Sequence, residues 1–451
     1  MLCWLRGYVP FYKRNLRLAY PVMLSQLGQV VVMLADSMMV GRLGKEELAA
    51  VSFANAIVMI GMLFALGVSF GSTPLVGADY VNGNHRKSAA TFQNSFLLNL
   101  FSALFVCSVL LGVSLFMDRM GQEESVCRLA VPYYRIVVVS LFPLMIFQSF
   151  KQFMEGVGDT EKAMLITIVS NVLNIVLNYL LIYGEFGFPK LGVDGAGWAT
   201  FISRLMMPFM FLFVFWKNKS LFRYFYFFAP KVFNKSRLLL LGGVGLPIGL
   251  QMLIEGFTFS MSAVMVGWFG SEMLSGHQIA WNISSMTFMV TCGISSATTI
   301  RVSHQLGVKD YLSLQKAGFA SMHLSAFFSL VMAALIVMFR YEIAALFIDN
   351  AAVIEIGAEL LVLVAVYQLA DGLQCVSLGA LRGLADVRGP MVIATICYIL
   401  VNLPIAYVLG EVCGFKAVGV WTGFIFGLNL AAVLLVYRFV SKSRQLLKAN
   451  R

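Results

Sequence analysis

The chain has 451 residues, of which 59% are apolar and only 12% are charged. Soluble domains are typically about 45–50% apolar and about 25% charged, so this composition excludes a soluble globular protein. The formal net charge of +11 would suit a nucleic-acid-binding protein, but the basic residues lie mostly in short connectors between long apolar runs. A chain of this length has room for roughly a dozen membrane crossings of about 20 residues each, and for no separate soluble domain.

Taken in chain order, the apolar runs predict two sets of six transmembrane helices. The first six lie near residues 16–40, 49–73, 92–116, 131–153, 163–183 and 193–216. The second six lie near residues 241–265, 277–300, 317–339, 356–380, 390–410 and 417–437. These runs are continuous and do not alternate in polarity, which favours helices over a β-barrel. We therefore expect an all-α polytopic membrane protein with 12 transmembrane helices in two pseudo-symmetric six-helix lobes.

The two sets of helices predict an N-lobe over residues 1–216, a basic linker over 217–237 and a C-lobe over 238–451. Most Lys and Arg residues of the connectors lie on the side that holds the linker and both termini, which the positive-inside rule assigns to the cytoplasm. Aromatic residues are interleaved with the bases of the linker, as in some RNA-binding segments. In a membrane protein they are better explained as interfacial anchors, so we expect no nucleic-acid partner.

The second half of the chain repeats the first at an offset of 226 residues. Pro21 falls on Pro247, the segment MMVGRLGKEEL mirrors VMVGWFGSEML, and Gly67 falls on Gly293. Six spans in each half make both repeats enter the membrane in the same direction, an arrangement found in alternating-access transporters. A duplicated bundle without transport activity is the alternative.

The repeated prolines Pro21 and Pro247 lie within the first predicted helix of each half. A proline inside a helix removes a backbone hydrogen bond and kinks the helix. The two residues act either as points of helix bending or as static kinks, and the sequence leaves both roles open.

Three acidic residues lie inside predicted spans and away from their ends: Asp36 in the first, Glu255 in the seventh and Asp371 in the tenth. An ionisable group in a span costs about 2.5–3.5 kcal/mol on insertion scales and is a functional candidate by default. A purely structural role would require buried bases as partners, and Arg204 is the only base well inside a span. Each carboxyl group is therefore a candidate to bind a proton or a cation.

Asn171, Asn174 and Asn178 follow a spacing of three and four residues, which places them on one face of the fifth predicted helix. If this face meets Asp36, a carboxylate and several amide oxygens form a cluster of hard ligands suited to Na⁺, or to a proton held on the carboxyl group. Hydrogen bonding between helices would explain the same residues, so both interpretations stay open.

Several stretches resemble bacterial multidrug and toxic compound extrusion (MATE) transporters of the NorM type, and the resemblance covers essentially the whole chain. They are DSMMVGRLG from Asp36, GHQIA from Gly276, TIRVS from Thr299, and Gly383 with Asp386. The resemblance implies a secondary active multidrug efflux antiporter and not an enzyme. Such a protein exports organic, often cationic and aromatic, drugs and dyes in exchange for inward Na⁺ or H⁺ by alternating access. It further implies no cofactor, a monomer, and a multi-pass location in the bacterial inner (plasma) membrane.

The resemblance also implies, residue by residue, two cation-binding sites. The N-lobe residues are Asp36, Asn174, Asn178 and Thr200; the C-lobe residues are Glu255 and Asp371, with Phe288 as an aromatic partner of the cation. Na⁺ is accordingly a candidate ligand at Asp36, Glu255 and Asp371. Archaeal relatives carry an acid at the position of Asn178, so its amide favours Na⁺ over a purely proton-based mechanism in the N-lobe.

Two other classes of function remain as alternatives. A flippase for lipid-linked saccharides would need bases along its cavity to hold a diphosphate, and away from the span ends only Arg135 and Arg204 lie within predicted spans. A membrane-embedded enzyme would need a nucleophile with a positioned base, or a metal. The four His residues are scattered, and neither an HExxH motif nor a phosphate-binding loop occurs, which disfavours an enzyme and an ATP-driven pump.

Overall fold

The structure, a computed structural model, describes residues 7–226 and 233–449. This part of the chain contains α-helices, short 3₁₀ and π-helical turns, and no strand. Twelve helical segments in it are long and apolar enough to cross a membrane, judged by length and composition. The predicted all-α class and the predicted number of spans are therefore confirmed.

Most of the spans in the described residues are single helices. They are α2 (Val9–Gly41), α5 (His85–Val113), α8 (Thr160–Tyr183), α9 (Val193–Lys217), α11 (Lys235–Gly267), α12 (Ser271–Gly307), α13 (Tyr311–Met338), α15 (Ala351–Gly383) and α18 (Lys416–Ala449). Several extend past the predicted apolar runs, because helical hydrogen bonding continues into polar residues beyond the hydrocarbon core.

The remaining spans are assembled from shorter pieces. They are α3 (Lys45–Phe70) with α4 (Ser72–Val81), α6 (Glu124–Val139) with α7 (Leu141–Gly156), and α16 (Arg388–Thr395) with α17 (Leu403–Tyr407) and the π-helical turns Ile396–Asn402 and Val408–Val412. Two short helices lie in connectors, α10 (Lys219–Tyr226) and α14 (Arg340–Ala345). Part of the predicted linker is thus helical, and its residues 227–232 lie outside the described residues.

Polar side chains cap several helices at their N-termini. Asp159 accepts from the backbone of Lys162 before α8, Asp310 from Ser313 before α13, and Asn350 from Ala352 before α15. Hydrogen bonds from Ser313 hold the pKa of Asp310 below its ordinary value. Such caps satisfy backbone N–H groups that the helix leaves free, and each contributes about 1 kcal/mol.

The chain folds into two compact units, one formed by Leu24–Gly249 and the other by Met1–Met23 together with Leu250–Arg451. The boundary divides α2 just after Pro21 and α11 just after Pro247, so each of these helices contributes to both units. The units therefore differ from the predicted lobes in the first segments of α2 and α11. The lobe boundaries themselves remain a prediction.

The segments of α2 before Leu24 and of α11 before Leu250 each belong to the unit formed mainly by the other repeat, and we call them the exchanged segments. Glycines let these segments pack closely. A Cβ atom on Gly67 of α3 would lie 2.6 Å from Cα of Gly249, which belongs to the first segment of α11. A Cβ atom on Gly293 of α12 would lie 2.9 Å from the backbone nitrogen of Met23, in the first segment of α2. Gly67 and Gly293 are equivalent in the repeat. The first segment of α11 therefore packs against α3 in the same way as the first segment of α2 packs against α12.

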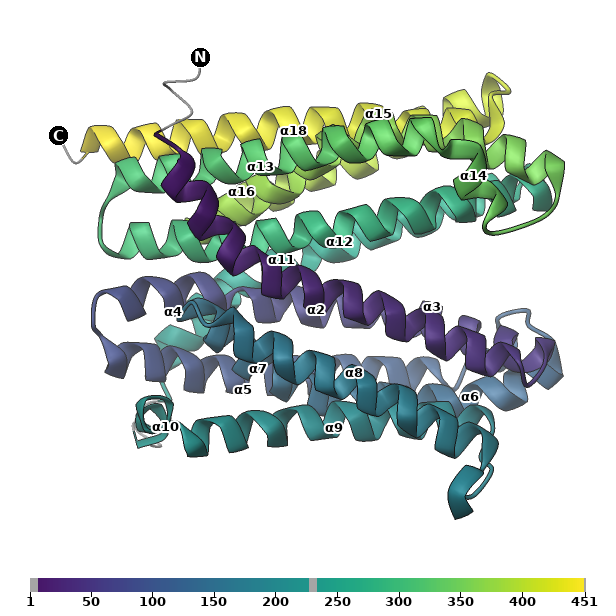
Figure 1. The fold of residues 1–451 in the computed structure, drawn as a ribbon, viewed down its shortest axis with the longest axis horizontal. Helices are drawn as coiled ribbons and strands as arrows, with labels where there is room; N and C mark the ends of the chain where they lie inside the picture. Colours follow the sequence, from purple (N-terminus) through teal and green to yellow (C-terminus); the bar gives the residue numbers. More distant parts are fainter. Residues whose placement is uncertain (1–6, 227–232, 450–451) are drawn as a thin grey trace. The chain divides into compact units, whose positions relative to one another are not determined.

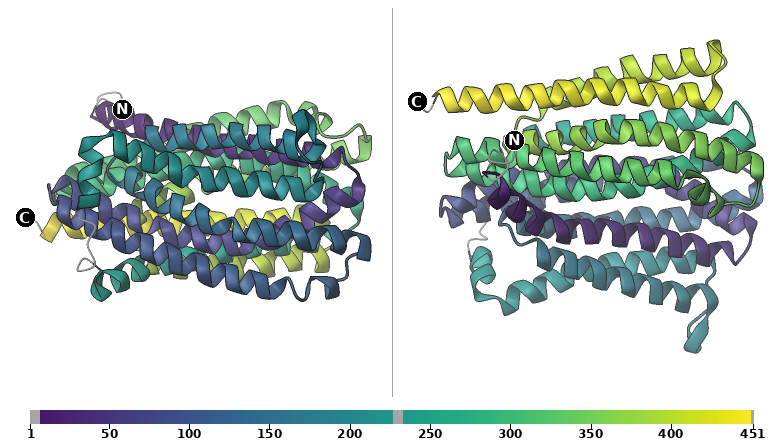
Figure 2. Two further views of the ribbon diagram at one scale, coloured as in Figure 1. Left: turned by 90° about the horizontal axis from the view of Figure 1, so that it is seen from below. Right: turned by 45° about the horizontal axis from the view of Figure 1, so that its top comes forward.

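In the unit Leu24–Gly249, α3 packs on α6, α5 on α7 and α8 on α9 (Figures 1 and 2). Its core contains a cluster of buried phenylalanines: Phe92, Phe150, Phe153, Phe211 and Phe215. The Phe92 and Phe153 ring centroids lie 4.6 Å apart, a contact typical of aromatic packing. These phenylalanines therefore stabilise the core of this unit.

In the second unit, α12 packs on α13 and α15, and α15 packs on α18 (Figure 1). Trp421 of α18 is buried, and its indole N–H donates to Nδ1 of His277 at 3.1 Å. Large apolar side chains cover the outside of the helices, for example Phe327 of α13, which is 70% exposed. Such exposure is expected where acyl chains and not water surround the protein.

Candidate functional site

A polar cluster in the unit Leu24–Gly249 joins α2, α8 and α9. The side-chain amide of Asn178 donates to the carboxylate of Asp36 and, at 3.2 Å, to Oδ1 of Asn174. Asn174 in turn donates to Oγ of Ser203 at 3.3 Å. Both asparagines are buried and Asp36 is half-buried. The asparagine face predicted from the sequence therefore meets Asp36.

This cluster contains an unused oxygen acceptor beside the carboxylate. Oδ1 of Asn178 is buried and has no hydrogen-bond partner in the described part of the chain. A buried acceptor without a partner is costly, since it has lost its water without replacing it. Carboxylate and amide oxygens are hard ligands, so the cluster has the donor type that Na⁺ takes.

Two predicted polar residues lie at the edge of this cluster. Thr200 is half-buried, and its carbonyl oxygen accepts from Oγ of Ser203 at 3.0 Å; among the described residues its own side chain forms no hydrogen bond. Asn171 lies against Gly28 of α2, where a Cβ atom would come within 2.9 Å of its amide nitrogen. The structure thus connects Asn174 and Asn178 directly to Asp36, and Thr200 only through Ser203.

Arg204 places a positive charge near the same carboxylate. Its Nη1 donates to Oγ of Ser140 at 2.7 Å, and its charge interacts with Asp36 and Tyr133. Tyr133 donates to Oδ1 of Asn55 at 3.2 Å. Charges interact strongly where water is scarce, so a cation that enters this cluster competes with Arg204 for Asp36.

A second polar cluster, in the unit that contains Leu250–Arg451, joins α11 to α15. Oε1 of Glu255 accepts from Gln251 at 3.0 Å and from Gln374 at 3.4 Å. Gln374 also donates to the hydroxyl of Tyr398 at 2.6 Å. Asp371 lies one helical turn before Gln374, is buried, and interacts electrostatically with Glu255. The structure therefore brings the two predicted C-lobe acids into one cluster.

Phe288, the predicted aromatic partner, is half-buried on α12. Its carbonyl oxygen accepts from the hydroxyl of Thr291 at 2.8 Å. In the described residues its ring has no aromatic or cationic neighbour, so its role remains a prediction.

Sequence reasoning missed Gln251, Gln374, Tyr398 and Ser203 as partners of the acids. The two glutamines could have been found, because Gln251 lies four residues before Glu255 and Gln374 three residues after Asp371, each one turn along its helix. Tyr398 carried no such signal, since it lies on a different span.

In the described residues, twelve candidate membrane spans in two similar halves, with carboxyl groups inside three of them, are the features of a membrane transporter. The MatE family model matches residues 21–180 and 247–408, and the two matches begin at Pro21 and Pro247, the offset predicted from the internal repeat. The chain therefore belongs to the MatE family, the multidrug and toxic compound extrusion transporters, and is not an enzyme.

Related proteins cover nearly the whole chain. It is 34% identical over 437 residues to the multidrug resistance protein NorM of Photobacterium profundum, a match that covers 95% of both chains. It is 32% identical over 451 residues to the multidrug resistance protein PmpM of Pseudomonas aeruginosa, covering 97% of this chain and 93% of that protein.

Solved structures share the fold. An outward-facing multidrug resistance MATE family transporter superimposes with a TM-score of 0.87 at 22% identity, covering 97% of both chains. The eukaryotic MATE transporter AtDTX14 superimposes with a TM-score of 0.89 at 17% identity, covering 98% of this chain and 99% of that one. At these identities the likeness establishes the architecture alone.

Proposed function

We propose that this protein is a secondary active multidrug efflux antiporter. It exports small organic drugs and dyes, often cationic and aromatic, in exchange for inward Na⁺ or H⁺ by alternating access. The names of the NorM and PmpM relatives support the multidrug part of this proposal. The observation that carries the antiport part is the hydrogen-bonded cluster of Asp36, Asn174 and Asn178 inside helices that cross the membrane.

The coupling cation binds at two places in this proposal. Asp36 and the free Oδ1 of Asn178 support Na⁺ in the first unit, because both are hard oxygen donors. Glu255 and Asp371 form the second place, where two neighbouring acids attract one positive charge, either Na⁺ or a proton. Moving one charge across a membrane potential of 100 mV is worth about 2.3 kcal/mol, enough to bias a bundle with two conformations.

Bending of α2 and α11 links cation binding to access. The helices that carry Asp36 and Glu255 also contain Pro21 and Pro247, and the unit boundary divides each helix just after its proline. A proline there weakens the helix at the point where it passes from one unit to the other. Cation binding at the acids and drug binding then compete, directly or through this bending.

The protein acts in this proposal as a monomer in the bacterial inner membrane, with both termini in the cytoplasm. The excess of Lys and Arg on the side of the termini supports this orientation. No observation favours the flippase alternative. Arg204 already donates to Ser140 and Arg135 to Ser114 at 3.4 Å, so these in-span bases are engaged within the first unit.

The proposal is tested by dye efflux from proteoliposomes in which a Na⁺ gradient and a pH gradient are imposed separately. We expect one of the gradients to drive efflux in the unaltered protein. Asp36→Asn and Asp371→Asn each reduce that efflux to the level of protein-free vesicles, because an amide neither binds a proton nor supplies a negative charge.

The matched control is Asp118→Asn, which changes an exposed acid in a connector and leaves efflux unaltered. The gradient that drives efflux identifies the coupling ion. Undiminished gradient-driven efflux in both Asp36→Asn and Asp371→Asn would overturn the proposal.

A further inference from the structure

A pocket of about 300 Å³ lies between α16 and the C-terminal part of α18 (Figure 1), and no residue of either carboxylate cluster lines it. Its apolar side is formed by Ile393 of α16 and by Leu434 and Tyr437 of α18. Tyr437 is 72% exposed, and tyrosine is typical of the boundary between acyl chains and headgroups. The connector charges predict that this end of α18 is cytoplasmic, so we expect the pocket at the headgroup level of the inner leaflet.

The polar side of this pocket is formed by hydrogen-bond donors of α18, two of them bases and none an acid: Arg438, Ser441, Lys442 and Gln445. These residues share one face of the helix, because they recur after about one turn. Among the described residues, the side chains of Ser441, Lys442 and Gln445 have neither a hydrogen-bond nor an ion-pair partner. Their donors are therefore available to a ligand.

Arg438 is held in place by Asp386. Its Nε and Nη2 each donate to a carboxylate oxygen of Asp386 at 2.8 Å. A Cβ atom on Gly389 would lie 2.0 Å from Cζ of Arg438, so the guanidinium group packs against the start of α16. This geometry leaves the N–H groups of Nη1 for a ligand. Because Asp386 balances the charge of Arg438, the net positive charge of the pocket comes from Lys442.

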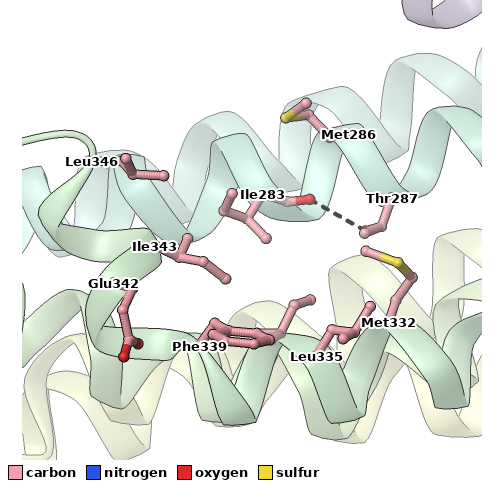
Figure 3. A pocket seen from close by; sticks show the side chains of 10 residues that line it. Ile283, Met286, Thr287, Met332, Leu335, Phe339, Glu342, Ile343 and Leu346 are labelled. Carbon is pink, nitrogen blue, oxygen red and sulfur yellow. Dashed lines mark hydrogen bonds between the residues drawn. The ribbon is translucent and has the colours of Figure 1, made fainter.

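A larger pocket, of about 600 Å³, lies between α12, α13 and α14 and has a different lining (Figure 3). Most of its side chains are apolar, such as Ile283, Leu335 and Phe339, and no base lines it. Acyl chains cover such a surface whatever headgroup they carry. This larger pocket therefore serves as an internal comparison for the pocket between α16 and α18.

We propose that the pocket between α16 and α18 binds the headgroup of an anionic phospholipid. The phosphate lies between Lys442 and Nη1 of Arg438, and an acyl chain runs along Leu434. Basic pockets between membrane helices on the cytoplasmic side suit such headgroups. A free phosphate ion would leave the apolar side of the pocket unused, and a zwitterionic lipid would bring an ammonium group toward the two bases. The binding does not rest on the proposed transport function.

The test uses the full chain in phosphatidylcholine nanodiscs that contain graded amounts of phosphatidylglycerol with a photoreactive diazirine near the top of one acyl chain. We expect saturable labelling within residues 388–396 and 434–445, mapped by mass spectrometry. Lys442→Gln, at an exposed position where the fold is not affected, weakens the apparent affinity about fivefold, the usual worth of one base near the membrane surface. Ser441→Trp fills the pocket and abolishes the saturable labelling.

Controls separate this site from general attraction of the lipid to a basic protein. Lys448→Gln removes an exposed base of the same helix that does not line the pocket, and it leaves the affinity unchanged. Labelling of the pocket between α12, α13 and α14 is the same with a photoreactive phosphatidylcholine and is unaffected by Lys442→Gln.

Three outcomes overturn the inference. They are equal losses of affinity in Lys442→Gln and Lys448→Gln, equal saturable labelling of the pocket by photoreactive phosphatidylcholine, and competition by soluble glycerol phosphate as strong as by phosphatidylglycerol. Because the assay imposes no ion gradient, its failure is distinct from a failure of the efflux assay.

Discussion

At the scale of single residues, Asn178 connects the only acid of the first span to the fifth span. It is fully buried, donates to Asp36 and to Asn174, and keeps one amide oxygen free of hydrogen bonds. A side chain that orients an ion ligand and also offers an oxygen of its own affects the affinity of the site more than the stability of the fold.

Asn178→Ala removes both the orientation of Asp36 and the free oxygen. We expect the concentration of coupling ion that gives half-maximal efflux to rise about tenfold, the lower end of what loss of a ligand-orienting group costs. The measurement is dye efflux at graded Na⁺ concentration or pH in proteoliposomes. Asn429→Ala, which alters an exposed asparagine of α18, serves as the control. An unchanged half-maximal concentration in Asn178→Ala contradicts this role.

At the scale of helices, α2 and α11 each contribute to both compact units. Close approach at Gly67 and Gly293 makes this exchange sterically feasible, because a side chain at either position would overlap the backbone of the exchanged segment. Small residues at such contacts are typical of membrane helices, where close packing takes the place of a hydrophobic driving force.

Gly67→Leu inserts a side chain where a Cβ atom alone would lie 2.6 Å from Cα of Gly249. We expect a loss of about 1–3 kcal/mol, the usual cost of overpacking, seen as a lower midpoint of thermal unfolding in detergent. Gly112→Leu is the matched control, since a Cβ atom there has no neighbour within 4 Å. The packing argument fails if the two variants unfold at the same temperature.

At the scale of the whole molecule, the charges of the connectors predict the orientation in the membrane. Cys413 lies between the eleventh and twelfth spans, in a connector predicted to be on the outer side. It is exposed, whereas Cys107, Cys127, Cys375 and Cys397 are buried. This thiol reports the sidedness of the protein.

A membrane-impermeant maleimide added to intact spheroplasts is expected to label the unaltered protein at Cys413, and Cys413→Ser removes the labelling. In the Cys413→Ser background, Ser236→Cys places a thiol at an exposed position near the start of α11, on the predicted cytoplasmic side. This thiol reacts only after the membrane is permeabilised. The reverse pattern would invert the predicted orientation.

The sequence by itself determined the class of protein, the number of spans and which acids lie well inside them. In lipid, the backbone N–H and C=O groups must form hydrogen bonds within helices of about 20 apolar residues. Each span is therefore visible as one continuous apolar run in the sequence. Carboxyl groups are rare in such runs because they are costly there, which made Asp36, Glu255 and Asp371 conspicuous. The repeat was visible because duplication preserves spacing, as from Pro21 to Pro247.

Only the tertiary structure decided which side chains meet. Helical spacing placed three asparagines on one face of α8, but the rotation of α8 against α2 made Asn178 the partner of Asp36. The contact of Gln374 with Glu255 and Tyr398, and the pocket between α16 and α18, join residues from different helices. The sequence also did not predict which unit contains the first segments of α2 and α11. Such contacts depend on how helices far apart in the chain rotate and pack, and hydropathy and periodicity describe each helix only by itself.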